Sequence, residues 1–130
     1  DDLSLASRYR GWDAYGQSKL ANMLFAHELS RRLANTDRTA IAVHPGVIAT
    51  NLGRHLGWMS GFFPLLSPLF LKSIPEGAAT QVWAATMPAP ETLDGQYCYD
   101  CNVQQSSAHG ADLAMARRLW DVTEGIVAAL

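Results

Sequence analysis

The sequence has little charge and almost no cysteine. Charged residues make up 17% of its 130 residues, the formal net charge is −2, and the lysines and arginines are scattered. Because nucleic-acid binding requires a clustered basic surface, we expect no nucleic-acid partner, and we interpret the Arg–Arg pairs at 31–32 and 117–118 as solvated positions on helices. The two cysteines, Cys98 and Cys101, form a C-x-x-C with no second pair to complete a four-ligand zinc site. We therefore expect no metal centre, and interpret them as thiols at the end of a strand in a reducing compartment.

Long uninterrupted hydrophobic runs are also missing. Residues 52–73 form the most apolar segment, but glycine and proline interrupt it at Gly57, Gly61, Pro64 and Pro68. A membrane-spanning helix needs about 20 consecutive apolar residues, so this segment does not predict one. Its apolar side chains are typical either of burial against neighbouring helices or of a surface that meets a lipophilic substrate or, through residues 58–71, a membrane.

One long helical pattern dominates what is present. Apolar residues recur at helical spacing over residues 13–34, after an irregular lead-in, and Asn35 with Asp37 provides a stop. Tyr15 and Lys19 are four residues apart, so they share a face of this helix with roughly 6 Å of axial rise between them. An ammonium beside a phenol favours the phenolate, which suits a general acid/base. A lone Y-x-x-x-K is more typical of two solvated side chains, since any helix can contain one by chance.

The rest of the chain alternates strand-like and helix-like segments. Short apolar runs predict a buried parallel strand at residues 39–44 and a last strand at residues 96–99, and helical patterns cover residues 75–87 and 111–124. Ligands of open α/β sheets bind beyond the carboxyl ends of the strands. Pro45, Gly46 and Val47, which follow the first of these strands, therefore lie where a cofactor would be held.

Four stretches of the chain are distinctive: YGQSKLAN at 15–22, HPGVIATNL at 44–52, PEGAAT at 75–80 and GQYCYDC at 95–101. Together, and in this order, they resemble the short-chain dehydrogenase/reductases, a family of nicotinamide-dependent oxidoreductases. The likeness is greatest to retinol-dehydrogenase-like and WW-domain-oxidoreductase-like members. It implies an α/β fold in which residues 1–130 form the C-terminal half of one NAD(P)-binding domain, a Rossmann-like, doubly wound parallel sheet with flanking helices.

The resemblance covers only that half of the family's domain. A doubly wound fold of this kind opens on a glycine-rich turn that holds the pyrophosphate, and the sequence contains no G-x-G-x-x-G. Because the chain also begins with Asp1 rather than methionine, we expect Asp1 to lie inside a longer fold. The family's catalytic serine and asparagine belong to the missing part, and Ser4 and Ser7 lie in no strand-like run that would replace the serine. The choice between NAD and NADP stays open, since the residues that decide it also lie there.

The resemblance assigns roles to six residues of this chain. Tyr15 would exchange a proton with the substrate oxygen, and Lys19 would support the ionised tyrosine and bind the nicotinamide ribose. Pro45 and Gly46 would lie against the cofactor, where glycine permits close backbone approach. The backbone of Val47 would meet the nicotinamide amide, and the Thr50 hydroxyl would hydrogen-bond the cofactor.

The resemblance also places the apolar segment at the family's variable flap over the substrate. Its flap residues would be Trp58, Phe62, Phe63 and Leu66. We thus predict an oxidoreductase that transfers a hydride between NAD(P)H and a lipophilic carbonyl or alcohol, in the cytoplasm or associated with a membrane, with its oligomeric state open. The alternative is a non-catalytic fragment or interaction module that lacks the cofactor-binding half.

Overall fold

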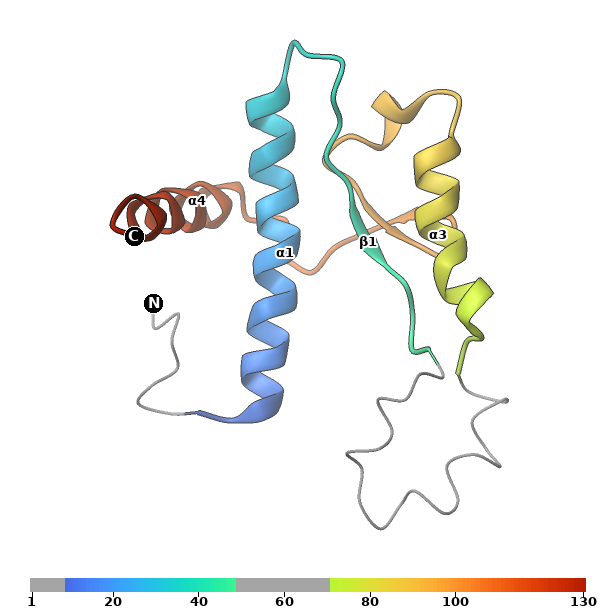
Figure 1. The fold of residues 1–130 in the computed structure, drawn as a ribbon, viewed down its shortest axis with the longest axis horizontal. Coiled ribbons are helices and arrows are strands. Elements are labelled where there is room, and N and C mark those ends of the chain that lie inside the picture. The colour runs from blue at the N-terminus through green and yellow to red at the C-terminus, as the bar shows by residue number, and fades with distance from the viewer. Residues whose placement is uncertain (1–8, 49–70) are drawn as a thin grey trace.

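The computed structural model describes residues 9–48 and 71–130 of the chain. Its elements are the helices α1 (Gly11–Leu33), α3 (Ile74–Thr86) and α4 (Leu113–Ala128), the 3-10 helix η3 (Pro90–Leu93), and the strands β1 (Ala42–His44), β2 (Tyr97–Tyr99) and β3 (Asn102–Gln104). Figure 1 shows the strands lying between α1 and α3, and α4 packs against α1. This arrangement of a sheet with flanking helices confirms the predicted α/β fold class.

The sheet is mixed rather than wholly parallel, with the strand order β1-β2-β3. Strands β1 and β2 pair in parallel, so that His44 lies opposite Tyr99, as expected for a doubly wound fold. Strands β2 and β3 pair antiparallel, which corrects the prediction that residues 96–99 form the last strand. The hairpin between them turns at Asp100 and Cys101, whose φ angles of 51° and 54° are the left-handed values that a tight two-residue turn requires.

Helix α1 is tied to the sheet at its C-terminal end. It begins at Gly11, two residues before the expected start, and Asn35 follows its end with a φ of 72°, so that Asn35 acts as the predicted stop. The carboxylate of Asp94 accepts hydrogen bonds from Ser30 Oγ and from the backbone N–H of Ala40, both at 2.8 Å. One side chain thus fixes the end of α1, the segment leading into β1 and the turn before β2.

A second set of polar contacts joins α1 to α4. Glu28 on α1 is only 2% exposed, and its carboxylate accepts from the Nε atoms of Arg31 and Arg32, each at 2.8 Å. The hydrogen bond from Arg31, aided by that from Arg32, lowers the pKa of Glu28 to about 2 against the cost of burial. The Arg32 guanidinium also lies 4.4 Å from the ring centroid of Trp120 on α4. Both arginines are exposed on α1, as predicted, but their contacts with Glu28 and Trp120 were not predicted.

The remaining core lies between the sheet and α3. Ala84, Leu93 and Cys98 are buried together, and partly buried apolar side chains surround them. Both cysteines are free, and burial raises the pKa of the Cys98 thiol, so this group remains protonated at neutral pH. Cys98 therefore acts as a core residue within β2.

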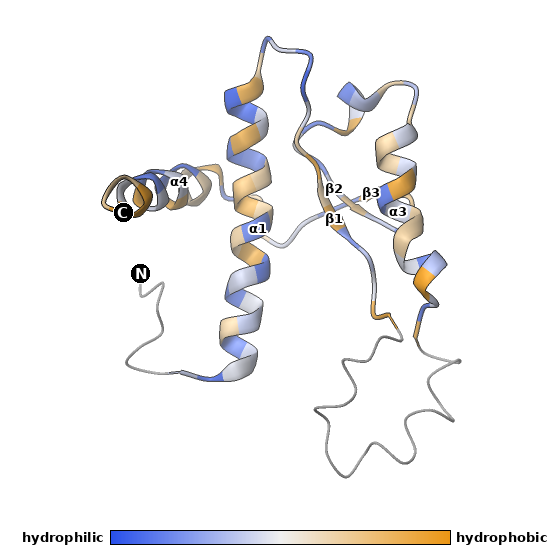
Figure 2. Ribbon diagram, viewed as in Figure 1, coloured by the Kyte–Doolittle hydropathy of each residue, from blue (hydrophilic) through white to orange (hydrophobic). Residues whose placement is uncertain are grey.

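The start of α3 follows from its sequence. Ser73 caps the helix in a reciprocal arrangement, in which Ser73 Oγ accepts from the Glu76 N–H and the Ser73 N–H donates to the Glu76 carboxylate at 2.8 Å. Pro75 lies in the first turn, as predicted. Figure 2 shows α3 as a mainly apolar helix, whereas hydrophilic and hydrophobic bands alternate along α1. Within residues 9–48 and 71–130, no helix combines the length and apolar character needed to cross a membrane.

Candidate active site

Tyr15 and Lys19 lie near the start of α1, on the same face of the helix. The Lys19 Nζ atom is 5.2 Å from the centroid of the Tyr15 ring, and the Trp12 and Tyr15 rings meet edge-to-face with centroids 6.3 Å apart. The Ser18 hydroxyl donates to the Tyr15 carbonyl and so belongs to the helix backbone rather than to the phenol. Tyr15 is 57% exposed. Helix α1 thus carries a phenol and an ammonium side by side on an exposed face.

The turn after β1 is the second part of the site. Gly46 has a φ of 83°, in the left-handed region that favours glycine, and its backbone N–H donates to His44 Nδ1 at 2.9 Å. Val47 follows with an exposed side chain. The predicted cofactor residue Thr50 and the flap residues Trp58, Phe62, Phe63 and Leu66 lie outside the described residues.

A cleft of about 740 Å³ brings these two parts together. Tyr15 and Lys19 line it from α1, and Pro45 and Gly46 line it from the turn after β1. Apolar residues of α1 and β1 form much of the remaining wall, and Val47 does not line it. Four of the six residues that the sequence assigned to catalysis or cofactor binding therefore share one cleft, although they lie about 30 residues apart in the chain.

The cleft also contains residues that the sequence did not single out. His44 lines it just before the turn, Tyr97 lines it from the start of β2, and Ser107 contributes from the segment between β3 and α4. Burial, together with the neighbouring Tyr99, raises the pKa of the Tyr97 phenol, so Tyr97 holds its proton more firmly than a free tyrosine. Of the two tyrosines in the cleft, Tyr15 is the one that stands beside a cation.

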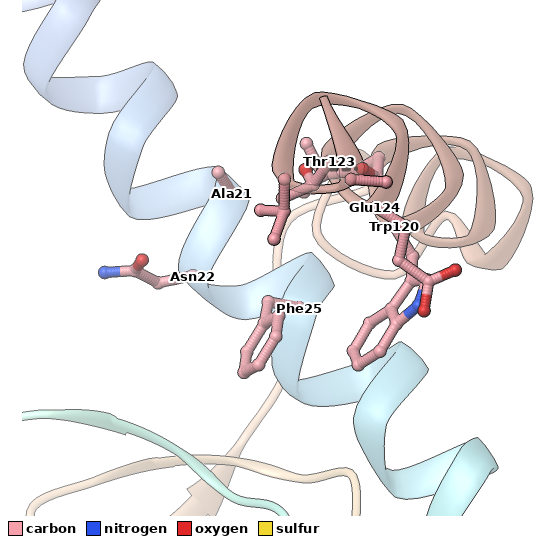
Figure 3. Close-up of a pocket in the computed structure, with 9 residues that line it drawn as sticks. Ala21, Asn22, Phe25, Trp120, Thr123 and Glu124 are labelled. Carbon is pink, nitrogen blue, oxygen red and sulfur yellow. Dashed lines mark hydrogen bonds between the residues drawn. The ribbon is translucent and has the colours of Figure 1, made fainter. Parts of the chain in front are cut away.

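A second cavity, of about 660 Å³, lies between α1 and α4 (Figure 3). The Phe25 and Trp120 rings stack beside it with centroids 5.3 Å apart, and the surrounding side chains are mostly apolar. The buried Trp120 Nε1 has no hydrogen-bond partner among the described residues. This cavity contains none of the predicted site residues, and Glu124 is the one ionisable side chain among the described residues that line it. The described part of the chain also holds no group of three or more His, Cys, Asp or Glu side chains placed to bind a metal ion.

Comparison with known proteins gives the family. No model of a protein family matches the chain. Over its full length, however, it is 40% identical to retinol dehydrogenase 14 of Homo sapiens and 40% identical to the short-chain dehydrogenase TIC 32 A, chloroplastic, of Brassica napus. It is also 41% identical, over 94% of its length, to retinol dehydrogenase 12 of Mus musculus. The chain spans about 40% of the length of these relatives.

An α/β fold with a Tyr–Lys helix facing the turn at the end of a parallel strand is the arrangement expected of a short-chain dehydrogenase/reductase. The full-length similarity agrees with it, and the chain belongs to that family. Within the family, it belongs with the retinol-dehydrogenase-like members.

Proposed function

We propose that the protein carrying this chain is a nicotinamide-dependent oxidoreductase that interconverts an alcohol and a carbonyl compound. The observation that carries the proposal is the cleft in which Tyr15 and Lys19 face Pro45 and Gly46. The relatives, which are dehydrogenases by name, support the same kind of reaction.

In this proposal Tyr15 moves the proton and Lys19 assists it. During reduction, the Tyr15 hydroxyl donates its proton to the substrate oxygen, and during oxidation the phenolate takes that proton back. The Lys19 ammonium, 5.2 Å from the ring centroid, stabilises the negative charge that develops on the phenol. A bound nicotinamide cofactor supplies or accepts the hydride.

The described residues fit one end of such a cofactor. The turn after β1 presents backbone at the carboxyl end of a parallel strand, where open α/β sheets bind their ligands, and Lys19 offers a cation to a ribose hydroxyl. We assign Tyr15, Lys19, Pro45, Gly46, Val47 and Thr50 to this end. The sequence contains no glycine-rich turn for the pyrophosphate, so the rest of the cofactor must be held by residues outside this chain, and either NAD or NADP satisfies the proposal.

A lipophilic substrate is the best match to the remaining features. Two of the relatives carry retinol, an apolar alcohol, in their names. The segment 52–73 is the most apolar of this sequence, and the bulky side chains that we propose as a wall over the substrate are Trp58, Phe62, Phe63 and Leu66. Contact of residues 58–71 with a membrane surface would give a lipophilic substrate a short route to the cleft.

The test is the substitution Tyr15→Phe in the full-length gene product. The phenyl ring keeps the packing but has no proton to transfer, so kcat should fall by roughly 10²- to 10⁴-fold while the Kd of the cofactor stays within about twofold. Tyr9→Phe is the matched control, because Tyr9 is an exposed tyrosine that lies just before α1 and outside the cleft. Near-normal turnover in the Tyr15 variant would remove Tyr15 from the mechanism.

One observation favours a second candidate, a non-catalytic interaction module. Among the described residues β1 pairs with β2 alone, so its other edge is available to a strand from elsewhere. The same experiment separates the two functions. A full-length gene product that neither binds NAD or NADP nor turns over any of a panel of aldehydes and ketones would favour the interaction module.

A further inference from the structure

Lys72 connects the turn after β1 to the start of α3. Its backbone N–H donates to the Val47 carbonyl at 2.8 Å, and Lys72 and Ile48 form an isolated parallel β-bridge. The next residue, Ser73, is the N-cap of α3. The backbone of Lys72 therefore links the end of the Pro45–Gly46–Val47 turn to the capped N-terminus of α3.

The Lys72 side chain reaches the hairpin between β2 and β3. Its ammonium forms an ion pair with the carboxylate of Asp100, and it lies 4.5 Å from the centroid of the Tyr99 ring. The hydrogen bond to Asp100 raises the pKa of Lys72, so the lysine is charged throughout the physiological range. With only 22% of its side chain exposed, Lys72 is better shielded than Asp100, which is 50% exposed.

The same side chain lies directly against Gly46. A Cβ atom at Gly46 would stand 2.8 Å from Cδ and 2.9 Å from Cε of Lys72, closer than carbon atoms approach in proteins. On another side, the Gly46 N–H is held by His44, whose ring lies 5.0 Å from that of Tyr99. The Lys72 side chain therefore packs between Gly46 and the Tyr99 ring. Only a glycine at position 46 leaves room for this contact, because a Cβ atom there would overlap with Lys72.

We propose that Lys72 is a positioning residue for the cofactor site. Through Asp100 and Tyr99 it fixes the Pro45–Gly46–Val47 turn on the β2–β3 hairpin, so that the turn is already in place when the nicotinamide end of a cofactor arrives. The inference rests on the proposed function of that turn. It gives Asp100, which lies in the GQYCYDC stretch but received no role from it, a share in cofactor binding, although neither residue lines the cleft.

The experiment compares variants of the full-length gene product. Lys72→Met keeps the aliphatic length and removes the charge, Lys72→Arg restores a cation, and Asp100→Asn removes the partner. Arg38→Met is the control for loss of one exposed positive charge, since Arg38 lies before β1 at the end away from the turn. Two quantities are measured: the steady-state KM for cofactor and kcat, and, without cofactor, the hydrogen-exchange rates of the Gly46, Val47 and Ile48 amides.

Because the turn binds ground state and transition state alike, Lys72→Met should raise the cofactor KM about tenfold while kcat at saturating cofactor changes less than about threefold. Lys72→Arg should restore most of the affinity for the cofactor, and Asp100→Asn should raise the cofactor KM as much as Lys72→Met does. The double variant Lys72→Met/Asp100→Asn should have a cofactor KM no higher than that of either single variant. Amide exchange at the turn should accelerate in Lys72→Met and Asp100→Asn but not in Arg38→Met.

Three results would overturn the proposal: an unchanged cofactor KM in Lys72→Met, no rescue by arginine, or additive losses in the double variant. If Lys72→Met does not fold, Asp100→Asn decides by the same measurements. If the wild-type protein shows no cofactor binding or turnover, the proposed function fails, and amide exchange then decides on Lys72 alone. Faster exchange in Lys72→Met but not in Arg38→Met would retain its role in fixing the turn, whereas equal rates would reject it.

Discussion

Replacing Glu28 with glutamine tests what holds the Tyr–Lys helix in position. Glu28 is buried on α1 beneath two arginines, one of which also packs on Trp120 of α4. The difference between an ordinary pKa of 4.5 and the value of about 2 in the folded chain corresponds to roughly 3 kcal/mol. The Arg31 and Arg32 side chains are 50% and 35% exposed, however, so solvent screening reduces the expected contribution to about 1–2 kcal/mol.

The pH dependence has a definite sign. Because folding lowers the pKa of Glu28, its contribution to the free energy of unfolding is fully present above pH 4.5 and is lost as the pH falls from 4.5 towards about 2. Glu28→Gln should therefore unfold at a lower urea concentration than the wild type at pH 7, and the gap should narrow at pH 3.

The control for Glu28→Gln is Glu124→Gln. Glu124 also faces Arg32, at 3.8 Å, but its side chain is 61% exposed, so its loss should cost less than about 0.5 kcal/mol. Urea titrations of the full-length gene product at pH 7 and pH 3, followed by tryptophan fluorescence, measure both variants. Equal losses for the two substitutions at pH 7, or a Glu28→Gln gap that is as wide at pH 3 as at pH 7, would refute the reasoning.

Two further predictions follow from the sequence and the cleft. In the full-length gene product, the double substitution Phe62→Ser and Leu66→Ser should reduce kcat/KM more for a long-chain alcohol than for a short one, because apolar contact is lost; equal losses would count against a substrate wall there. The 130-residue chain expressed alone should neither bind NAD or NADP in calorimetry nor reduce a panel of aldehydes and ketones, since it has no glycine-rich turn for the pyrophosphate; saturable binding or clear turnover would require a complete site within these residues.

Local patterns in the sequence were enough to predict the elements that form the candidate site. The helix with Tyr15 and Lys19 follows from apolar residues at helical spacing, and β1 with its Pro45-Gly46 turn follows from a short apolar run before two residues that end strands. These features depend on neighbours in the chain, so the sequence contains the information directly. That the helix and the turn share a cleft came from the family resemblance, because no local pattern specifies their distance.

The features that were missed depend on contacts between distant residues. Strand β3 escaped notice because the hairpin turns at Asp100 and Cys101, whereas an Asn-Gly or Asp-Gly pair would have signalled it. The packing of Arg32 on Trp120 was missed because the ring lies on another helix, about 90 residues away. The role of Lys72 could not be predicted because its partners, Gly46 and Asp100, are each more than about 25 residues away in the sequence, and no local pattern brings them together.

In the proposed function, proton transfer and the anchoring of the cofactor's phosphates fall to different parts of the protein. Tyr15, Lys19 and the Gly46 turn come together through α1, β1 and the contacts behind the turn, and none of these contacts requires a pyrophosphate site. Anchoring requires a glycine-rich turn at the end of another strand. Among the described residues one edge of β1 has no paired strand, and a further parallel strand can join the sheet there. One parallel strand added beside β1 could thus extend the sheet. It would also bring a glycine-rich turn to the same end of the sheet as Gly46, because parallel strands end on the same side. If the proposed function holds, turnover should therefore depend on the pairing of that edge as well as on Tyr15.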